Sequence, residues 1–323
     1  MPRLTPLVFA CALAAAGCMK NPATGERQLS LISQEQEIAL GQQAKQEVAQ
    51  SIGLYDNNEL QSYVSGLGKK LAAVSERPNL PWSYQVVDDA AVNAFALPGG
   101  PIFVTRGLLT YLNSEAELAA VMGHESGHVT ARHAANMISK QQLAQLGLGI
   151  GTILLPEGLR GLGQLAGAGM SLVFLKYSRD AENQADELGF RYALKTGYDV
   201  RKMKDVFVTL ERASEGQSKG RLPQWLATHP DPENRIKATE RRLAETKGVD
   251  FSKLAVGHEG YVDRLQNVIF GENPRHGFFR GTTFLHPDLR FQFSFPAGWK
   301  AANQPGAVVG VGPKQDAAIQ LSA

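Results

Sequence analysis

The pattern of apolar and polar residues predicts a chain that is mainly helical over its first 250 residues. Two segments carry helix start signals, because Ser33 with Gln36 and Ser114 with Glu117 each match the capping box. Gly197 stands where a helix beginning near residue 180 would end in a left-handed glycine. The helices expected from these signals cover residues 33–51, 58–77, 114–137, 180–195, 200–213 and 232–245.

Short stretches near residue 90 have the alternation and composition of β-strands. Residues 82–87 alternate and are rich in aromatic and β-branched side chains. Residues 92–97 and 102–105 flank a Pro-Gly-Gly-Pro turn, and this arrangement predicts a hairpin. Past residue 276 the pattern again favours strands, which are expected at residues 284–295, 308–311 and 317–321.

These elements predict an α+β fold in which a mainly helical domain carries a small β-sheet or hairpin beside the helix at 114–137. The domain is expected over residues 33–250. A connector over residues 251–280 would lead to a short, incomplete β-rich segment at 281–323.

Two Gly-, Leu- and Ala-rich runs without charged residues lie at 141–156 and 161–175. Each is shorter than the roughly 18 residues expected of a membrane-spanning helix. A pair of buried helices is the expectation. A lid over a site and a hairpin that dips into a membrane are the alternatives.

The N-terminus has the features of an export signal over residues 1–17, with Arg3, an apolar stretch and a run of small residues. The run ends at Cys18 and resembles the cleavage box of bacterial lipoproteins, so residues 18–32 are expected to form a linker lipidated at Cys18. An ordinary signal peptide is the alternative. Because Met19 and Lys20 replace the aspartate that retains lipoproteins at the inner membrane, we expect the periplasmic face of the outer membrane.

The composition limits the partners and the metal ligands that this chain can use. The chain has 33 basic and 31 acidic residues without a basic stripe, and this balance argues against a nucleic-acid partner. Its two cysteines are Cys11 and Cys18, so the body of the chain offers neither disulfides nor thiolate ligands. A metal site in this chain must therefore use imidazole and carboxylate groups.

His124, Glu125 and His128 form an HExxH motif within the helix expected at 114–137. Residues four apart share one helix face, so the two imidazoles can grip one metal ion while Glu125 points to the open coordination position. A buried histidine pair in the core is the alternative. A glutamate between two buried histidines would be costly without a function.

A catalytic zinc ion takes three protein ligands, and Glu182 is the candidate for the third. The spacing of the metzincins, which use a third histidine, is excluded because Ala134 stands at that position. Asp186 lies one turn beyond Glu182 and would fix the tautomer of a histidine ligand. A solvated acidic helix face is the alternative for this pair.

Four segments together resemble one peptidase family. They are Asn93 to Gly100, His124 to His128 with His133, Tyr177 to Glu182 with Asp186, and Thr228-His229-Pro230. The family is that of the gluzincin metallopeptidases, which includes the CAAX prenyl proteases and the heat-shock protease HtpX. The periplasmic lipoprotein branch is the most similar. The match covers residues 20 to 250. The chain has no clear membrane spans, so prenylated substrates are not expected, and the segment after residue 250 is unlike the helical-repeat tail of some relatives, so their partner contacts are not carried over.

The resemblance implies one Zn²⁺ per chain and a metalloendopeptidase in which Glu125 is the general base on zinc-bound water. His229 would stabilise the oxyanion or serve as a fourth ligand, with a surface loop histidine as the alternative. Asn93, Ala94 and Phe95 would bind an extended substrate as an added strand, unless they form a plain structural hairpin. Unfolded or misassembled polypeptides of the cell envelope are the expected partners. The rival functions are a latent zinc-binding chaperone and a zinc hydrolase of non-peptide substrates.

Overall fold

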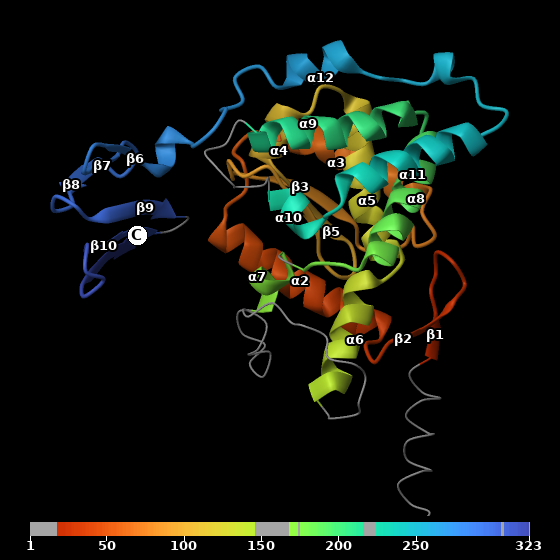
Figure 1. The fold of residues 1–323 in the computed structure, drawn as a ribbon, viewed down its shortest axis with the longest axis horizontal. Coiled ribbons are helices and arrows are strands. Elements are labelled where there is room, and N and C mark those ends of the chain that lie inside the picture. Colours follow the sequence, from red (N-terminus) through yellow and green to blue (C-terminus); the bar gives the residue numbers. More distant parts are fainter. Residues whose placement is uncertain (1–17, 146–167, 174, 216–223, 305–306, 323) are drawn as a thin grey trace, which may run out of the picture.

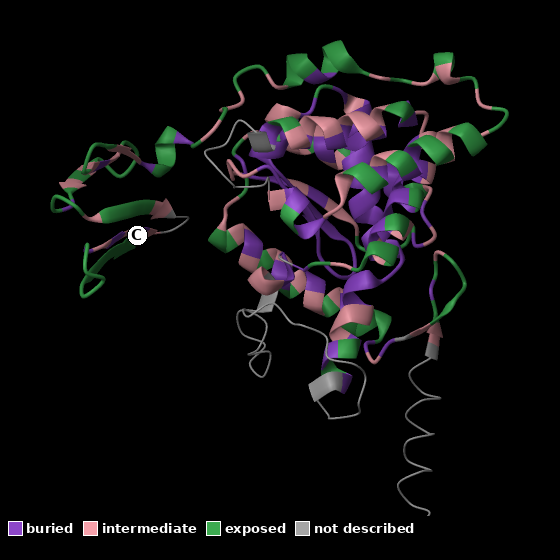
Figure 2. Cartoon of the chain, viewed as in Figure 1, coloured by how far each residue is buried: buried purple, intermediate pink, exposed green. Residues whose placement is uncertain are grey.

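The computed structural model describes residues 18–145, 168–173, 175–215, 224–304 and 307–322. Helices surround a small sheet, and short strands follow at the C-terminal end, so the expected α+β fold is confirmed. Figure 1 shows the C-terminal strands at one end of the molecule, beside the helical body. Buried residues concentrate in the central helix α5 and the strands of the small sheet beside it (Figure 2).

The helices match most of the predicted segments. Ser33 caps the first described helix through a capping box with Gln36, as its sequence predicts, and Ser114 caps α5. The helices are α2 (Gln34–Ser51), α3 (Asn58–Ala73), α4 (Arg106–Tyr111), α5 (Glu115–Thr130), α6 (His133–Gln145), α7 (Ala168–Leu172), α8 (Arg179–Lys195), α9 (Met203–Glu215), α10 (Gln224–Thr228), α11 (Pro232–Glu245) and α12 (His258–Arg264), with 3₁₀ turns η2 (Val200–Lys202), η3 (Phe251–Lys253) and η4 (Pro274–His276).

The small sheet has the order β3-β5-β4. Strand β3 (Ser83–Val87) pairs in parallel with β5 (Pro101–Thr105), and β4 (Ala94–Ala96) pairs with β5 in the antiparallel direction. The hairpin predicted around the Pro-Gly-Gly-Pro turn is therefore confirmed. Helix α5 packs against β4 and β5, so the sheet supports the helix that carries the HExxH motif.

The single helix predicted over residues 114–137 is wrong, because the chain breaks between α5 and α6. Arg132 has a φ of 59°, which a continuous helix does not allow. Its guanidinium bonds to the buried carboxylate of Glu37 at 2.8 Å, and Arg77 bonds to the same carboxylate at 2.9 Å. This buried cluster connects the break between α5 and α6 to α2. Local sequence patterns do not predict it, because its three residues are far apart in the chain.

Helices α5 and α8 approach closely because glycines line their contact. A Cβ atom on Gly189 would lie 2.6 Å from the backbone nitrogen of His124, and one on Gly127 would lie 2.9 Å from the Ala185 carbonyl oxygen. Both distances are too short for a side chain. The glycines therefore bring the acidic residues of α8 up to the histidines of α5.

The expected linker at 18–32 is wrong in part, because residues there form an antiparallel hairpin of β1 (Cys18–Lys20) and β2 (Arg27–Leu29). The hairpin lies against α6, where the Leu31 amide donates to the Ser139 hydroxyl at 2.9 Å. The expected signal segment at 1–17 lies outside the described residues, and so does most of the Gly-rich region at 141–175. Among the helices described, none combines the length and the apolar character of a membrane span.

The C-terminal strands form two three-stranded sheets, β6-β7-β8 and β11-β10-β9. The single strand predicted over 284–295 is wrong, because a turn with Arg290 at a φ of 56° divides it. The strands are β6 (Phe278–Arg280), β7 (Thr283–His286), β8 (Phe291–Ser294), β9 (Lys300–Gln304), β10 (Ala307–Val311) and β11 (Ala318–Ser322). The segment before them is held by Arg106, which donates to the carbonyls of Ile269 and Gly271, and by Asp88, which accepts from Asn273 at 2.6 Å.

Candidate metal centre

Four buried side chains converge at the centre of the domain: His124, His128, Glu182 and His229. One potential ligand atom from each lies within 4.8 Å of all the others. Helix α5 supplies two of them, α8 supplies Glu182, and the residue directly after α10 supplies His229. The structure thus brings together the three predicted ligands and adds His229 to the same cluster.

Asp186 fixes the orientation of His124. Its Oδ1 atom lies 2.9 Å from His124 Nδ1, closer than the Arg235 Nη2 donor at 3.1 Å, and a carboxylate accepts, so that nitrogen carries the proton. The Nε2 atom of His124 is then a bare lone pair, and it lies 3.0 Å from Nε2 of His128. The sequence places Asp186 one turn after Glu182, and the structure puts it at the contact expected of it.

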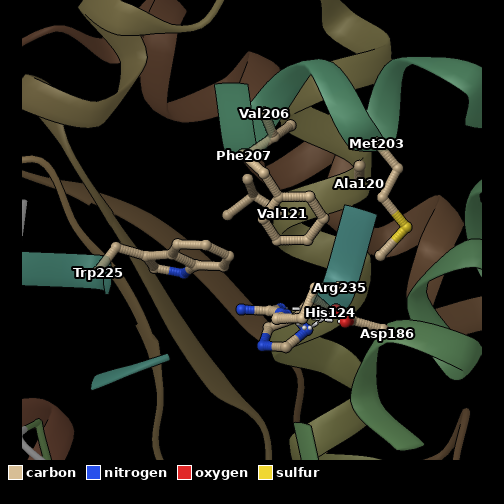
Figure 3. A pocket seen from close by; sticks show the side chains of 9 residues that line it. All are labelled: Ala120, Val121, His124, Asp186, Met203, Val206, Phe207, Trp225 and Arg235. Carbon is tan, nitrogen blue, oxygen red and sulfur yellow. Dashed lines mark hydrogen bonds and ion pairs between the residues drawn. The ribbon is translucent and has the colours of Figure 1, made fainter. Parts of the chain in front are cut away.

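Asp186 is itself held by Arg235 of α11. The guanidinium donates to both carboxylate oxygens, at 2.6 and 2.8 Å. Burial raises the pKa of Asp186, but the charge and hydrogen bonds of Arg235 outweigh it and hold that pKa below its ordinary value of 3.8. The Arg235 cation packs against the rings of Phe207 and Trp225, at 4.6 and 4.8 Å from their centroids. Figure 3 shows this cation beside His124 and Asp186 in a small pocket.

Glu125 is fully enclosed, with 1% of its surface exposed. Burial raises its pKa, while His229 and His124 act in the opposite direction. The indole of Trp225 donates to Glu125 Oε1 at 3.3 Å, and His229 Nε2 lies 3.5 Å from the same oxygen. A carboxylate with a raised pKa beside a metal-ligand cluster is suited to accepting and returning a proton.

His229 bridges the ligand cluster and Glu125. Its Nδ1 atom lies 3.0 Å from Glu182 Oε1 and 3.2 Å from His124 Nε2. Burial lowers its pKa, but the charges of Glu182 and Glu125 outweigh burial and the net shift is upward. Because its exposed fraction is 3%, the alternative of a surface loop histidine does not hold.

His128 is enclosed by two aromatic rings that the sequence did not single out as site residues. The ring of Tyr177 stacks on it at 4.1 Å between centroids, and His133 Nδ1 lies 2.9 Å from His128 Nδ1. Burial lowers the pKa of His133 to about 4, so this imidazole is neutral at physiological pH. The family resemblance offered one hint, because Tyr177 and His133 both stand inside the segments quoted for it.

The donor set fits zinc. Three imidazoles and one carboxylate are the nitrogen and oxygen ligands that zinc takes, and four donors match its tetrahedral coordination. The facing lone pairs of the ligand cluster also need a cation between them, since neutral acceptors 3.0 Å apart repel each other. His124, His128, Glu182 and His229 are the side chains that would hold the ion.

The predicted substrate strand lies at the edge of the small sheet. The Thr105 amide donates to the Asn93 carbonyl at 3.0 Å, so the backbone groups of Asn93 and Phe95 face β5 and those of Ala94 face away. Ala94 has no exposed surface, and on the same edge the Trp225 amide of α10 donates to the Val92 carbonyl at 3.1 Å. The Oδ1 atom of Asn93 is buried without a hydrogen-bond partner among the residues that the structure describes.

Comparison with known proteins identifies a shared domain. The model of peptidase family M48 matches residues 58–243. The chain is 32% identical over 236 residues to the beta-barrel assembly-enhancing protease of Yersinia pestis, covering 70% of this chain and 48% of that protein. It is 31% identical over 230 residues to the mitochondrial metalloendopeptidase OMA1 of Schizosaccharomyces pombe, covering 70% of this chain and 66% of that protein. This chain thus spans about half the length of its bacterial relative.

Proposed function

This chain belongs to peptidase family M48, and on that premise we propose that it is a zinc-dependent endopeptidase that cleaves extended, unfolded or misassembled polypeptides at the cell envelope. The gluzincin resemblance inferred from its motifs is confirmed, as is its assignment to the metallopeptidases. The observation that carries the proposal is the convergence of four buried donors directly beside the carboxylate of Glu125.

We assign His124, His128 and Glu182 as the permanent zinc ligands. When bound, zinc would supply the Lewis acidity that activates water and polarises a peptide carbonyl. Asp186 would keep the lone pair of His124 Nε2 directed at the ion, and Arg235 would keep Asp186 ionised.

Glu125 would accept a proton from the attacking water and return it to the leaving amine. Its burial supports this role, because a raised pKa brings a carboxyl closer to the pH at which both steps are possible. The Trp225 indole would orient the carboxylate through its hydrogen bond. His229 would face developing negative charge on the substrate from its position beside Glu125.

We propose that the conformation described here is a resting one. With His229 among four converging donors, a tetrahedral site has no position left for water or substrate. Helix α10 ends immediately before His229, and its Trp225 amide bonds to the Val92 carbonyl on the outward edge of the same strand segment as Ala94. Movement of α10 would therefore free a coordination position and the edge of β4 together. This closed state supports slow or regulated proteolysis, and it keeps the latent, chaperone-like function as the second candidate.

The substrate class follows from the edge strand. Once uncovered, the outward amide and carbonyl of Ala94 could pair with an extended polypeptide, which recognises backbone more than side chains. Such recognition favours unfolded chains over folded ones. The names of the relatives, one an assembly-enhancing protease and the other a mitochondrial metalloendopeptidase, are compatible with envelope polypeptides as substrates.

We further propose that the chain is exported and attached through a lipid on Cys18, with the peptidase facing the periplasm from the outer membrane. The proposal rests on the sequence of residues 1–20. Mass spectrometry of the protein isolated from bacterial membranes would test it. A mature N-terminus other than acylated Cys18 would overturn the anchor without affecting the peptidase assignment.

Glu125→Gln tests the function. The variant should retain one zinc ion per chain and lose casein cleavage by at least about 100-fold, because the amide cannot accept the proton. Zinc content by elemental analysis and cleavage of unfolded casein measure the two properties. Ala94→Pro, tested beside it, should keep zinc and lose casein cleavage while small amides, which need no added strand, are affected less.

Three controls separate the candidates. If wild type and Glu125→Gln both hold zinc and neither cleaves, the latent function replaces the protease, unless His229→Ala releases activity. Cleavage of small esters but not casein would support a hydrolase of non-peptide substrates. A wild-type chain without zinc would contradict the ligand assignment itself.

A further inference from the structure

A continuous hydrogen-bonded path connects His128 to the N-terminal hairpin. His128 Nδ1 lies 2.9 Å from His133 Nδ1, and His133 Nε2 lies 2.8 Å from Gln184 Oε1. The same Gln184 oxygen accepts a hydrogen bond from Asn21 Nδ2 at 3.1 Å. Asn21 stands in the turn between β1 and β2, three residues after Cys18.

The direction of every hydrogen bond in this path is determined from its outer end. The Ala23 amide donates to Asn21 Oδ1 at 2.9 Å, so the Asn21 side chain must present its NH₂ group to Gln184. Gln184 therefore presents its oxygen, and an amide oxygen only accepts. His133 must consequently donate from Nε2, and this leaves Nδ1 as an acceptor.

The consequence reaches the metal centre. Because His133 Nδ1 accepts, His128 must carry its proton on Nδ1, and its Nε2 atom is then the free lone pair that faces His124 Nε2 and Glu182. Asp186 imposes the same tautomer on His124 from the opposite side. The two histidines thus obtain the same arrangement from two different partners, a carboxylate and a neutral imidazole.

We propose that His133 is a positioning residue that holds His128 in its zinc-binding tautomer, and that Asn21 and Gln184 impose this state from the N-terminal hairpin. The inference rests on the proposed ligand set. It gives the hairpin a role in metal binding beyond packing, since the turn that follows the proposed anchor sets the orientation of a ligand nearly 110 residues later in the chain.

Burial supports a specific role. His133 and Asn21 have exposed fractions of 7% and 5%, so water competes little for their hydrogen bonds. The stacked ring of Tyr177 restricts His128 on one face, but stacking leaves the tautomer undetermined. The hydrogen bond between His133 and His128 Nδ1 determines the tautomer of His128.

The test uses isosteric changes in the full-length chain. Asn21→Asp keeps the acceptor for the Ala23 amide but replaces the NH₂ group with an oxygen, so Gln184 would turn its own NH₂ group toward Asp and His133. The path would then reverse, and His128 would carry its proton on Nε2. His133→Leu removes the acceptor. His133→Asn restores one, because Asn Oδ1 occupies nearly the place of His Nδ1, and Gln184→Glu keeps the oxygen.

Zinc affinity in competition with a chelator and the ¹⁵N shifts of the histidine rings in the metal-free chain are measured for each variant. We expect Asn21→Asp and His133→Leu to weaken zinc binding by about 10- to 100-fold, with the His128 tautomer changed in Asn21→Asp. We expect His133→Asn and Gln184→Glu to bind zinc almost as tightly as wild type.

Equal weakening by His133→Leu and His133→Asn would overturn the inference, because packing alone would then explain the loss. Wild-type affinity and an unchanged His128 tautomer in Asn21→Asp would overturn it as well. If His128→Ala bound zinc as tightly as wild type, the proposed ligand set would fail instead. The ring-nitrogen shifts are measured without metal or substrate, so they separate this inference from the proposed proteolysis.

Discussion

At the residue scale, the site depends on one buried cation. Arg235 neutralises Asp186 through two hydrogen bonds and lies 3.5 Å from Glu182, while two aromatic rings pack against it. The HExxH residues are predictable because their geometry is local to one helix. Arg235 is not, since only the packing of α11 against α8 brings it within reach of Asp186. For the same reason, His133 becomes a neighbour of His128 only where the chain breaks after α5.

Asp186→Asn should make the free energy of unfolding of the metal-free protein depend less on pH in the acid range. The folded-state pKa of Asp186 is lowered, so its contribution is fully present above its ordinary pKa of 3.8 and is lost as the pH falls further. Near neutral pH the variant should lose about 3 kcal/mol, because Arg235 keeps its charge without a full partner. Urea unfolding between pH 3 and pH 7 measures this.

The difference in unfolding free energy between wild type and Asp186→Asn should shrink below about pH 4, as Asp186 takes up its proton in the unfolded chain. Glu187→Gln on the same helix is the matched control. A difference that stays constant over the whole pH range would contradict the charge pairing of Asp186 with Arg235.

At the element scale, the distance between α5 and α8 positions the ligands. Sequence spacing predicted both helices and their acidic and imidazole residues, but it did not predict how closely they approach. That distance depends on Gly189 and Gly127, whose missing side chains allow backbone contact. A helix-interior glycine costs about 1 kcal/mol of helix stability relative to alanine. The close packing of α5 against α8 offsets this cost.

Gly189→Ala should push α8 away from α5 and weaken zinc binding. The new methyl group would lie 2.6 Å from the His124 backbone nitrogen, and relief of this overlap should cost about 1–3 kcal/mol. Thermal unfolding of the metal-free chain and zinc affinity are the measurements.

Gly66→Ala in α3 is the control, because its methyl group would meet nothing within 4 Å in the described part of the chain. It should stabilise the protein by up to about 1 kcal/mol through helix propensity. If both alanine variants gained stability, close approach through Gly189 would not be what sets the helix distance.

At the scale of the whole molecule, a buried ion pair joins the C-terminal strands to the peptidase domain. Arg106 bonds to Asp88 at 2.7 Å, and the two side chains together hold the chain at Ile269, Gly271 and Asn273. The alternating pattern predicted strands in this region. Their attachment at Arg106 depends on contacts between residues more than 160 positions apart, which local patterns do not encode.

Arg106→Met should loosen this attachment and leave the metal centre intact. Asp88 would keep a buried charge with weaker partners, so unfolding should become easier by about 3 kcal/mol. Limited proteolysis should cut between residues 265 and 277 sooner than in wild type, with zinc content unchanged.

Arg275→Ala, which alters an exposed ion pair on the same segment, should change the cleavage rate little. If Arg106→Met and wild type were cleaved by the protease at the same rate, other contacts would hold the strands.

The deep burial of the ligand cluster has a kinetic consequence. All four donors expose 3% or less of their surface, so a chelator in solution has no direct access to a bound ion. Metal can leave only when the protein opens, and that opening has its own rate. The rate of inactivation by a chelator should therefore become independent of chelator concentration when the chelator is in large excess. That limiting rate is the opening rate of the resting enzyme.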